Sequence, residues 1–276
     1  MNATAAVPRA RVIVAVGSTS PDPLTLAAAA QLAHAVGGEL AALFVEDVDL
    51  LRLAELPIAF EISAALPTPR PFAASDIERG FKAQAIELRS AVVEIANVLQ
   101  LDFTFDVVRG KPASALFEAS AERDLIVLAG AAARAFTHHP PASVVRHALR
   151  ATASGAKSRR AQPVAAVLQA AHSAQRVLAV AHGLARASAA ELILFLATNN
   201  DAGDTQLATL VGHWLAEEDA SARIIAMHDS APANVAKLVA QEGSHVLFWP
   251  GDGNLAMAAA VEPLLAAISC PLIVVR

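Results

Sequence analysis

Short apolar runs alternate with longer helical patterns along the first part of the chain. The β-branched run at residues 12–16 leads through the turn-rich segment GSTSPDP into an alanine-rich helical pattern at 24–36, which Gly37 and Gly38 should end. The apolar segments ELAALFVED, FTFDVVRG and DLIVLAG predict three further strands, with helices predicted at 77–99 and over PASALFEASAER. Uniformly apolar strands separated by helices are typical of a parallel sheet that is covered on both faces.

The second part of the chain repeats this order. The segments PVAAVLQ, ELILFLAT, ARIIAMH and HVLFWPG predict strands, and helical patterns lie between them. Residues 163–196 overlay residues 11–44 without a gap, and Leu26, Leu32, Glu39 and Leu40 coincide with Leu178, Leu184, Glu191 and Leu192. The sequence therefore predicts two tandem doubly wound α/β domains with parallel sheets, residues 1–155 and 156–276, joined near residues 150–162.

The second part ends with a helix over NLAMAAAVEPLLAAIS and a strand over CPLIVVR that have no counterpart in the first part. The two sheets should therefore be unequal. An open edge built from the last strand would expose unpaired backbone groups and apolar side chains. The residues of this predicted assembly edge are Leu272, Ile273, Val274 and Val275. We expect the strand to pair either with the matching edge of a second chain, in a homodimer, or with the first domain of its own chain.

A long insert at residues 48–76 is the largest difference between the two parts. It carries eight large apolar residues, too many for a free loop: Leu50, Leu51, Leu53, Leu56, Ile58, Phe60, Ile62 and Phe72. The insert leaves the carboxyl edge of the sheet, where open α/β sheets bind ligands. It should either cover that crevice as a lid or fill the groove between the two domains, and the second interpretation is the simpler one.

Composition limits the kinds of function. The chain has 276 residues, a net charge of −5 and 55% hydrophobic residues, so nothing favours general binding to nucleic acid or to an anionic membrane. No apolar run reaches the roughly 18–20 residues that cross a bilayer. The single cysteine, Cys270, cannot form an internal disulfide and fits a small buried side chain. We expect a cytoplasmic protein.

Three segments carry a resemblance to a known family: RVIVAVGSTS, VVRGKPASALFEASAERDLIVLAG and LLAAISCPLIVVR. Together they resemble the universal stress protein family in its tandem form, over almost the whole chain. The resemblance implies an adenine nucleotide alpha hydrolase-like fold with strand order 3-2-1-4-5 in each domain and domains paired edge to edge. It also implies a nucleotide site in some members, with an aspartate at the end of the first strand and a G-x-x-G-(nine residues)-G-S/T loop after the fourth.

This sequence departs from that nucleotide-binding pattern in both halves. Gly17-Ser18 stands where the aspartate is expected, and after Gly130 the second glycine is replaced by Ala133. Alanine disfavours the positive φ and the close phosphate approach that glycine allows. The candidate ligand-binding residues that the resemblance implies are Gly17, Ser18, Val45, Gly110, Gly130, Arg134, Ser143 and Val144. In the second half the first strand ends in Gln169, and the segment PGDGNLAMAAAVEP leaves no room for a phosphate loop.

Other polar segments have simpler interpretations than ligand binding. The segment at 251–254 is interpreted as a tight turn capped by Asn254 rather than a phosphate loop, since Asp252 would repel phosphate. The serines and threonine at 18–20 fit a helix cap, although they could also donate to phosphate. The basic cluster at 146–160 fits a solvated linker better than a surface for an anionic partner. Three histidines could be read as metal ligands, but no carboxylate lies close to them in the sequence, so a metal site is not expected. They are His138, His139 and His147.

Two functional hypotheses follow. The first is a non-catalytic stress-response or regulatory protein of the universal stress type, without cofactor or metal, whose surfaces bind partners. The second is an ATP-binding member with slow hydrolysis, which would use ATP with a divalent metal and an altered loop around Gly130 and Ser143. No Ser/His/Asp, Cys/His or paired-carboxylate arrangement can be defended from spacing, so a conventional enzyme is not expected. Because the aspartate and the glycines are independent losses at one place, the first hypothesis is preferred.

Overall fold

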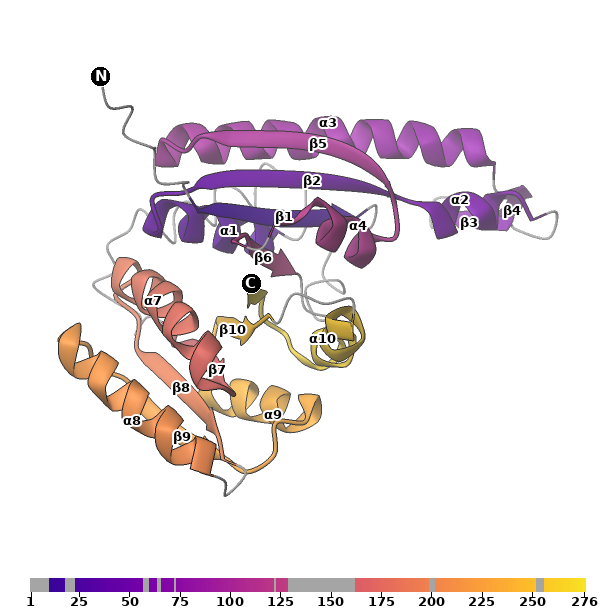
Figure 1. Cartoon of the computed structure of the whole chain (residues 1–276). Coiled ribbons are helices and arrows are strands. Elements are labelled where there is room, and N and C mark those ends of the chain that lie inside the picture. The colour runs from indigo at the N-terminus through magenta and orange to yellow at the C-terminus, as the bar shows by residue number, and fades with distance from the viewer. Residues whose placement is uncertain are drawn as a thin grey trace.

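The computed structural model describes residues 10–17, 23–56, 60–63, 66–71, 73–121, 123–128, 162–198, 202–251 and 256–276 (Figure 1). The strands are β1 Arg11–Gly17, β2 Glu39–Asp47, β3 Phe60–Ser63, β4 Leu66–Pro71, β5 Phe103–Gly110, β6 Leu125–Leu128, β7 Val164–Leu168, β8 Leu192–Ala197, β9 Arg223–Met227, β10 Val246–Pro250 and β11 Leu272–Val275. The helices are α1 Pro23–Ala35, α2 Val48–Ala54, α3 Ala74–Leu99, α4 Pro112–Ala119, α7 Ala171–Ala187, α8 Ala202–Glu217, α9 Pro232–Glu242 and α10 Ala256–Ala267. Every strand and helix predicted from the apolar pattern in these ranges is present.

The strand order within each half is the predicted one. The first half has the order β5-β2-β1-β6 and the second half β11-β10-β7-β8-β9, so each places its first strand beside its second and fourth. All neighbouring pairs within each half are parallel. The doubly wound α/β fold is therefore confirmed. Among the described residues, the first half contributes four strands to the nine-stranded sheet and the second half five, so the two halves are unequal as predicted.

The two halves do not have separate sheets, as two tandem domains would suggest. β6 and β11 pair in antiparallel register, with Leu128 opposite Leu272 and Leu125 opposite Val275, and this pair joins all nine strands into one mixed sheet. The physical reason is that β1 covers only one edge of β6: the other edge would be open, and β11 satisfies the backbone groups there. The predicted boundary at 155/156 lies outside the described residues.

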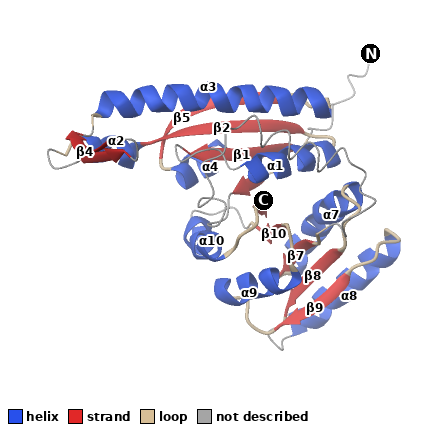
Figure 2. Ribbon diagram, turned by 180° about the vertical axis from the view of Figure 1, so that it is seen from behind, coloured by secondary structure: helices blue, strands red, loops and turns tan. Residues whose placement is uncertain are grey.

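Helices cover both faces of this sheet across the two halves (Figure 2). Successive residues of a strand point to opposite faces. Val12 and Val14 of β1 belong to the hydrophobic layer that also contains residues of α1, α3, α7 and α8, while Ile13 belongs to the opposite layer, with residues of α4, α9 and α10. Both hydrophobic layers contain residues from both halves. The halves are thus joined through side-chain packing as well as through the β6–β11 pair.

Gly37 and Gly38 end α1 as predicted. Gly37 has a φ of +61°, and the Gly38 amide donates to the Ala33 carbonyl at 2.8 Å, the pattern of a helix that stops in the left-handed region. A Cβ at Gly38 would lie 2.2 Å from the Ala10 carbonyl oxygen. The chain therefore turns at once into β2, beside β1.

The last strand is buried in the seam between the halves. The side chains of Leu272, Ile273 and Val274 are fully buried, and Val275 is 3% exposed. β11 pairs with β10 on one side and with β6 on the other. Of the two arrangements expected for this strand, the structure has the pairing within one chain, and its edge is not open to a second chain. Cys270 is buried as predicted, and burial raises the pKa of its thiol to about 12.

The insert after β2 does not fill the groove between the halves. Its described parts are α2 and the antiparallel hairpin β3–β4, and both views show them beyond the end of the first half, beside α3 and away from the second half (Figures 1 and 2). Leu50 and Leu51 pack against the core, whereas Leu53, Leu56 and Phe60 are 46%, 48% and 61% exposed. The prediction of an interface segment was therefore wrong, and among the described residues of the insert Leu50 and Leu51 contact the core.

Candidate functional site

The carboxyl edge of the first half brings together three of the eight predicted ligand-binding residues. Gly17 at the end of β1 pairs in register with Val45 of β2, and Gly110 at the end of β5 lies opposite Asp47 of β2. Because parallel strands end at one edge of a sheet, these positions lie side by side there. The other five predicted residues, Ser18, Gly130, Arg134, Ser143 and Val144, lie outside the described residues.

Charged side chains that were not predicted occupy the same edge. Arg109, next to Gly110, donates from Nε and Nη2 to Oε2 of Glu46 at 2.9 and 2.8 Å, and Nη2 also lies 3.5 Å from Oε1 of Glu78. The hydrogen bonds and charge of Glu46 raise the pKa of Arg109. Lys111 Nζ lies 3.5 Å from Oδ2 of Asp49, so both cations of the segment VVRGK are paired with carboxylates.

The segment FVEDVD at the end of β2 supplies Glu46 and Asp49, whereas Glu78 comes from α3. Asp47 also caps α2, since its Oδ1 accepts from the Asp49 amide at 2.9 Å. The sequence has a signal that could have predicted this charged edge. Acidic residues follow the apolar run of one strand, and a basic pair follows that of its neighbour.

The carboxyl edge of the second half has a different set of polar contacts. Thr198, after β8, has its Oγ1 3.1 Å from Nδ1 of His228, after β9. Asp229 accepts from the Ala231 amide at 2.8 Å and from Nδ2 of Asn234 at 2.6 Å, and so fixes the start of α9. These side chains bond to one another and to a helix end. Residues 252–255, which include the turn proposed to be capped by Asn254, are not described.

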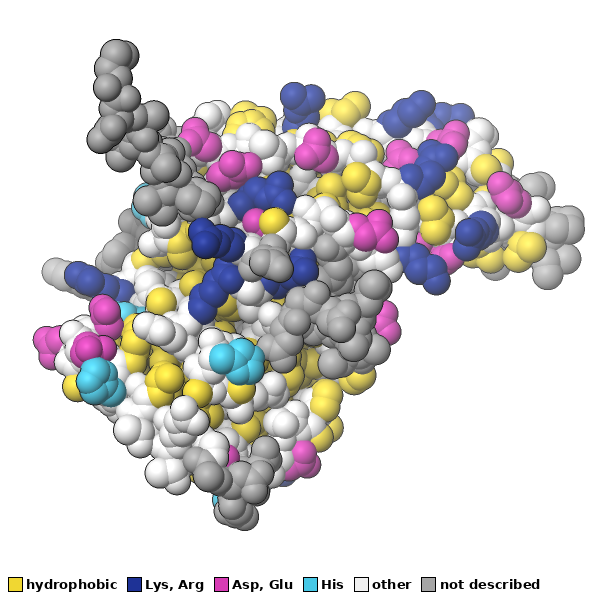
Figure 3. All heavy atoms as spheres, in the orientation of Figure 1, with side chains coloured by type: hydrophobic (Ala, Val, Ile, Leu, Met, Phe, Trp, Pro, Cys, Tyr) yellow, Lys and Arg dark blue, Asp and Glu magenta, His cyan; other side chains and the backbone are white. Residues whose placement is uncertain are grey.

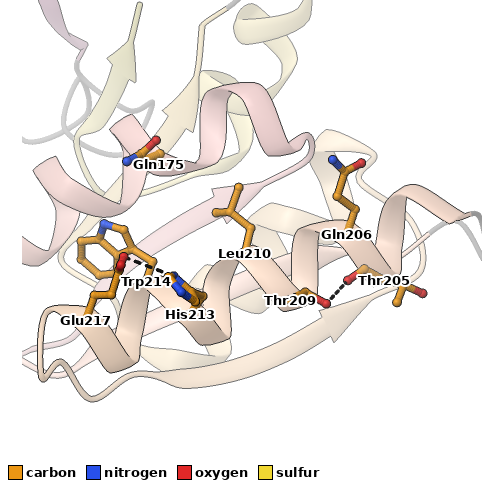
Figure 4. Close-up of a pocket in the computed structure, with 8 residues that line it drawn as sticks. All are labelled: Gln175, Thr205, Gln206, Thr209, Leu210, His213, Trp214 and Glu217. Atoms are coloured by element: carbon orange, nitrogen blue, oxygen red, sulfur yellow. Dashed lines mark hydrogen bonds and ion pairs between the residues drawn. The ribbon is translucent and has the colours of Figure 1, made fainter.

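A hollow of about 660 Å³ lies between α7 and α8 (Figure 4). Its lining residues are Gln175, Thr205, Gln206, Thr209, Leu210, His213, Trp214 and Glu217. The polar contacts drawn there stay within α8: Nδ1 of His213 is 3.2 Å from Oε2 of Glu217, and Thr209 donates to the Thr205 carbonyl at 2.7 Å. The indole of Trp214 is buried edge-on against His182, with ring centroids 5.5 Å apart. The labelled side chains do not point toward a common centre, so they do not together form a binding site for a ligand.

Two further features concern metal binding and membrane spans in the part of the chain that the structure describes. There, no three His, Cys, Asp or Glu side chains are placed to hold a metal ion together. The histidines at 138, 139 and 147 are not among these residues. Within the same ranges, none of the helices combines the length and the apolar character that a membrane span needs.

Comparisons with known proteins place the fold. The structure resembles that of a universal stress protein from Archaeoglobus fulgidus with a TM-score of 0.56 and 11% sequence identity, over 96% of each chain. A functionally unknown protein from Pseudomonas aeruginosa aligns over 97% of this chain and 92% of its own, with a TM-score of 0.45 and 10% identity. No family model and no curated protein sequence matches the chain. The chain thus has the fold of universal stress proteins.

Proposed function

We propose that this chain is a non-catalytic, cytoplasmic regulatory protein of the universal stress type, in which the nucleotide motif is eroded in both halves. The observation that carries the proposal is the charged carboxyl edge of the first half. There Arg109 is bonded to Glu46, and Lys111 is paired with Asp49. Arg109 and Lys111 at this edge are therefore paired with carboxylates rather than directed at a phosphate.

The sequence at both edges supports the same conclusion. β1 ends in Gly17, where a nucleotide-binding member has an aspartate, and Gln169 follows the end of β7 in the second half. Without that carboxylate the nucleoside loses its anchor, and without the second glycine at Ala133 the phosphates lose close backbone donors. Regulation would then pass through contacts with partner proteins. A second copy of the chain is one such partner, and it would have to pair elsewhere than at β11.

The second candidate function is an ATP-binding protein that uses Gly130 and Ser143 with a divalent metal. Melting curves of the whole chain with ATP and Mg²⁺ separate the two. A site filled at 100 times its dissociation constant stabilises a protein by about 2.7 kcal/mol, which is a shift of several degrees. We expect millimolar ATP to shift the melting temperature little, and no more than tripolyphosphate does.

A shift of several degrees at micromolar ATP, lost in Gly130→Val or Ser143→Ala, would establish the second function instead. Mass spectrometry of protein purified without added nucleotide gives an independent result. We expect no nucleotide to co-purify, and a stoichiometric amount of ATP or ADP would refute the proposal.

A further inference from the structure

The insert after β2 forms an arm, which we define as α2 together with the hairpin β3–β4. No described residue of α2 is fully buried. Leu53 on α2, Leu56 just after it and Phe60 at the start of β3 expose about half of their side chains or more. Figure 3 shows yellow hydrophobic side chains among charged ones at this end of the molecule. Large apolar side chains exposed so close together indicate a contact surface.

The outer edge of β4 is closed to a further strand. Pro71 of β4 lies opposite Phe60 of β3, and Arg70 lies opposite Glu61. Because proline has no N–H, the bonds between the strands fall on the pair of Glu61 and Arg70, and Pro71 turns its nitrogen outward. Pro69, two residues earlier, removes the next donor in the same direction. Prolines at such positions are one way in which natural sheets close an edge.

The outer edge of β3 is open. Its sequence contains no proline, and among the described strands it pairs only with β4. Since Glu61 bonds to β4, the backbone N–H and C=O groups of Phe60 and Ile62 point to the outer edge. Free donors and acceptors along a strand form a template for another strand. A hairpin of two strands is marginally stable in water, and a further strand makes it more stable.

We propose that two copies of this chain associate through their arms, with β3 of one copy paired antiparallel to β3 of the other. The strand order is then β4–β3–β3–β4, and both outer edges are the proline edges of β4. This closure favours a second copy over an extended peptide from another protein. A peptide strand would carry its own open edge, whereas a second hairpin leaves none and stops the assembly at a two-fold dimer.

The charges of α2 suit contact between two identical arms. Its sequence VDLLRLA contains one acidic and one basic residue. Nη1 of Arg52 lies 3.5 Å from Oδ1 of Asp49, and Lys111 Nζ lies 3.5 Å from Oδ2 of the same carboxylate. Two copies of α2 therefore meet without a strong repulsion between like charges. The inference rests on the proposed function, in which a second copy is one partner, and it names the surface that this copy uses.

Sedimentation velocity and light scattering of the whole chain over a range of concentrations test the contact. We expect a dimer that becomes a monomer on dilution. Ile62→Pro removes an outward N–H of β3, keeps the bonds of Glu61 to β4 and requires only that Glu61 stay extended. This variant should be monomeric at concentrations where the wild type is a dimer, with an unchanged circular dichroism spectrum.

A second pair of variants decides the result even where Ile62→Pro fails to fold. Phe60→Ser should raise the dissociation constant of the dimer about tenfold or more, because the ring no longer leaves water on association. Ile86→Ser is the matched control, since Ile86 lies on α3 outside the arm and is 68% exposed, and it should leave the dissociation constant unchanged.

Hydrogen exchange gives the position of the contact. The amides of residues 60–63 should become more protected as the dimer forms. A wild type that stays monomeric, or a dimer that Phe60→Ser weakens no more than Ile86→Ser does, would overturn the inference. The proposed function is tested separately: a melting shift of several degrees with micromolar ATP would refute it without changing the mass, and a monomeric wild type would leave the response to ATP unchanged.

Discussion

Each half has a joint between the starts of its first and fourth strands, and this joint has different chemistry in the two halves. In the first half, Arg11 and Asp124 precede the paired residues Val12 and Leu125, and a charged hydrogen bond of 2.8 Å links them. In the second half, Pro163 and His245 hold the equivalent places before β7 and β10. There Nδ1 of His245 lies 3.1 Å from the Pro163 carbonyl oxygen.

This difference shows which part of the duplicated fold is fixed and which is free to vary. Both halves need a link between the starts of their first and fourth strands, because these neighbours come from distant parts of the sequence. The chemistry of that link can differ between the halves. An ion pair and a neutral contact both serve, but they respond differently to mutation and to pH. The next predictions use this contrast, together with the unequal number of strands.

Removal of residues 270–276 should have the largest effect, because it deletes the strand that only the second half has. Burying four aliphatic side chains contributes about 6 kcal/mol or more, which compares with the roughly 5–15 kcal/mol that stabilises a whole domain. The truncation also opens the edges of both β6 and β10. We expect aggregated or unfolded protein in circular dichroism and light scattering. Removal of Arg276 alone is the control and should leave the fold intact. A soluble truncated chain with unchanged melting would show that β11 does not hold the halves together.

Asp124→Ala should have the next largest effect, because it removes the buried carboxylate that accepts from both Arg11 and the Ala121 amide. Removing one partner of a partly buried charged pair costs about 3 kcal/mol. Urea unfolding should give this loss in the free energy of unfolding. Asp76→Ala, which breaks an exposed pair with Arg79, should change it by less than about 0.5 kcal/mol. Equal losses in both variants would mean that burial of the first joint adds nothing to its strength.

His245 should make the stability of the second half depend on pH. Burial is the main cause that lowers the pKa of His245 below 6.5, so the unfolded chain binds a proton more readily than the folded one. Stability is therefore complete above pH 6.5 and falls as the pH drops toward the lower folded pKa, by up to about 1.4 kcal/mol per pH unit. We expect this slope in urea unfolding between about pH 7 and 5. His245→Gln keeps a donor for the Pro163 carbonyl and should flatten the curve; an unchanged slope would assign the effect to other groups.

The sequence predicted the helices and strands well, but it predicted poorly which of them pair or pack together. The runs of β1, β7 and β10 are uniformly apolar, and this pattern follows from burial on both faces of a parallel sheet. The antiparallel pairing of β6 with β11 leaves no such pattern, because an apolar edge strand looks the same whichever partner covers it. Phe60, an apolar residue of the insert, similarly suggested burial, but its side chain is exposed.

The candidate site was predictable only in part, for a related reason. Gly17, Val45 and Gly110 follow from strand ends, which the sequence marks by its change from apolar to turn residues. The ion pairs of Arg109 with Glu46 and of Lys111 with Asp49 depend on strand register. Register between segments far apart in sequence cannot be inferred from either segment alone. The ion pair of Arg11 with Asp124 at the seam has the same origin, since its two partners come from distant parts of the chain.

The smallest effects should come from the outer strands, each of which carries an arginine bonded to two glutamates. Arg109 on β5 is bonded to Glu46 and Glu78, and Arg223 on β9 to Glu191 and Glu242. Both arginines are about half exposed, so water and salt screen their charges. We expect Arg109→Gln and Arg223→Gln to melt close to the wild type. Any difference should vanish in about 1 M NaCl, where screening acts over about 3 Å. A large, salt-resistant loss in Arg109→Gln alone would show that the ion pairs at the carboxyl edge of the first half hold β5 and the insert in place, a role without a counterpart in the second half.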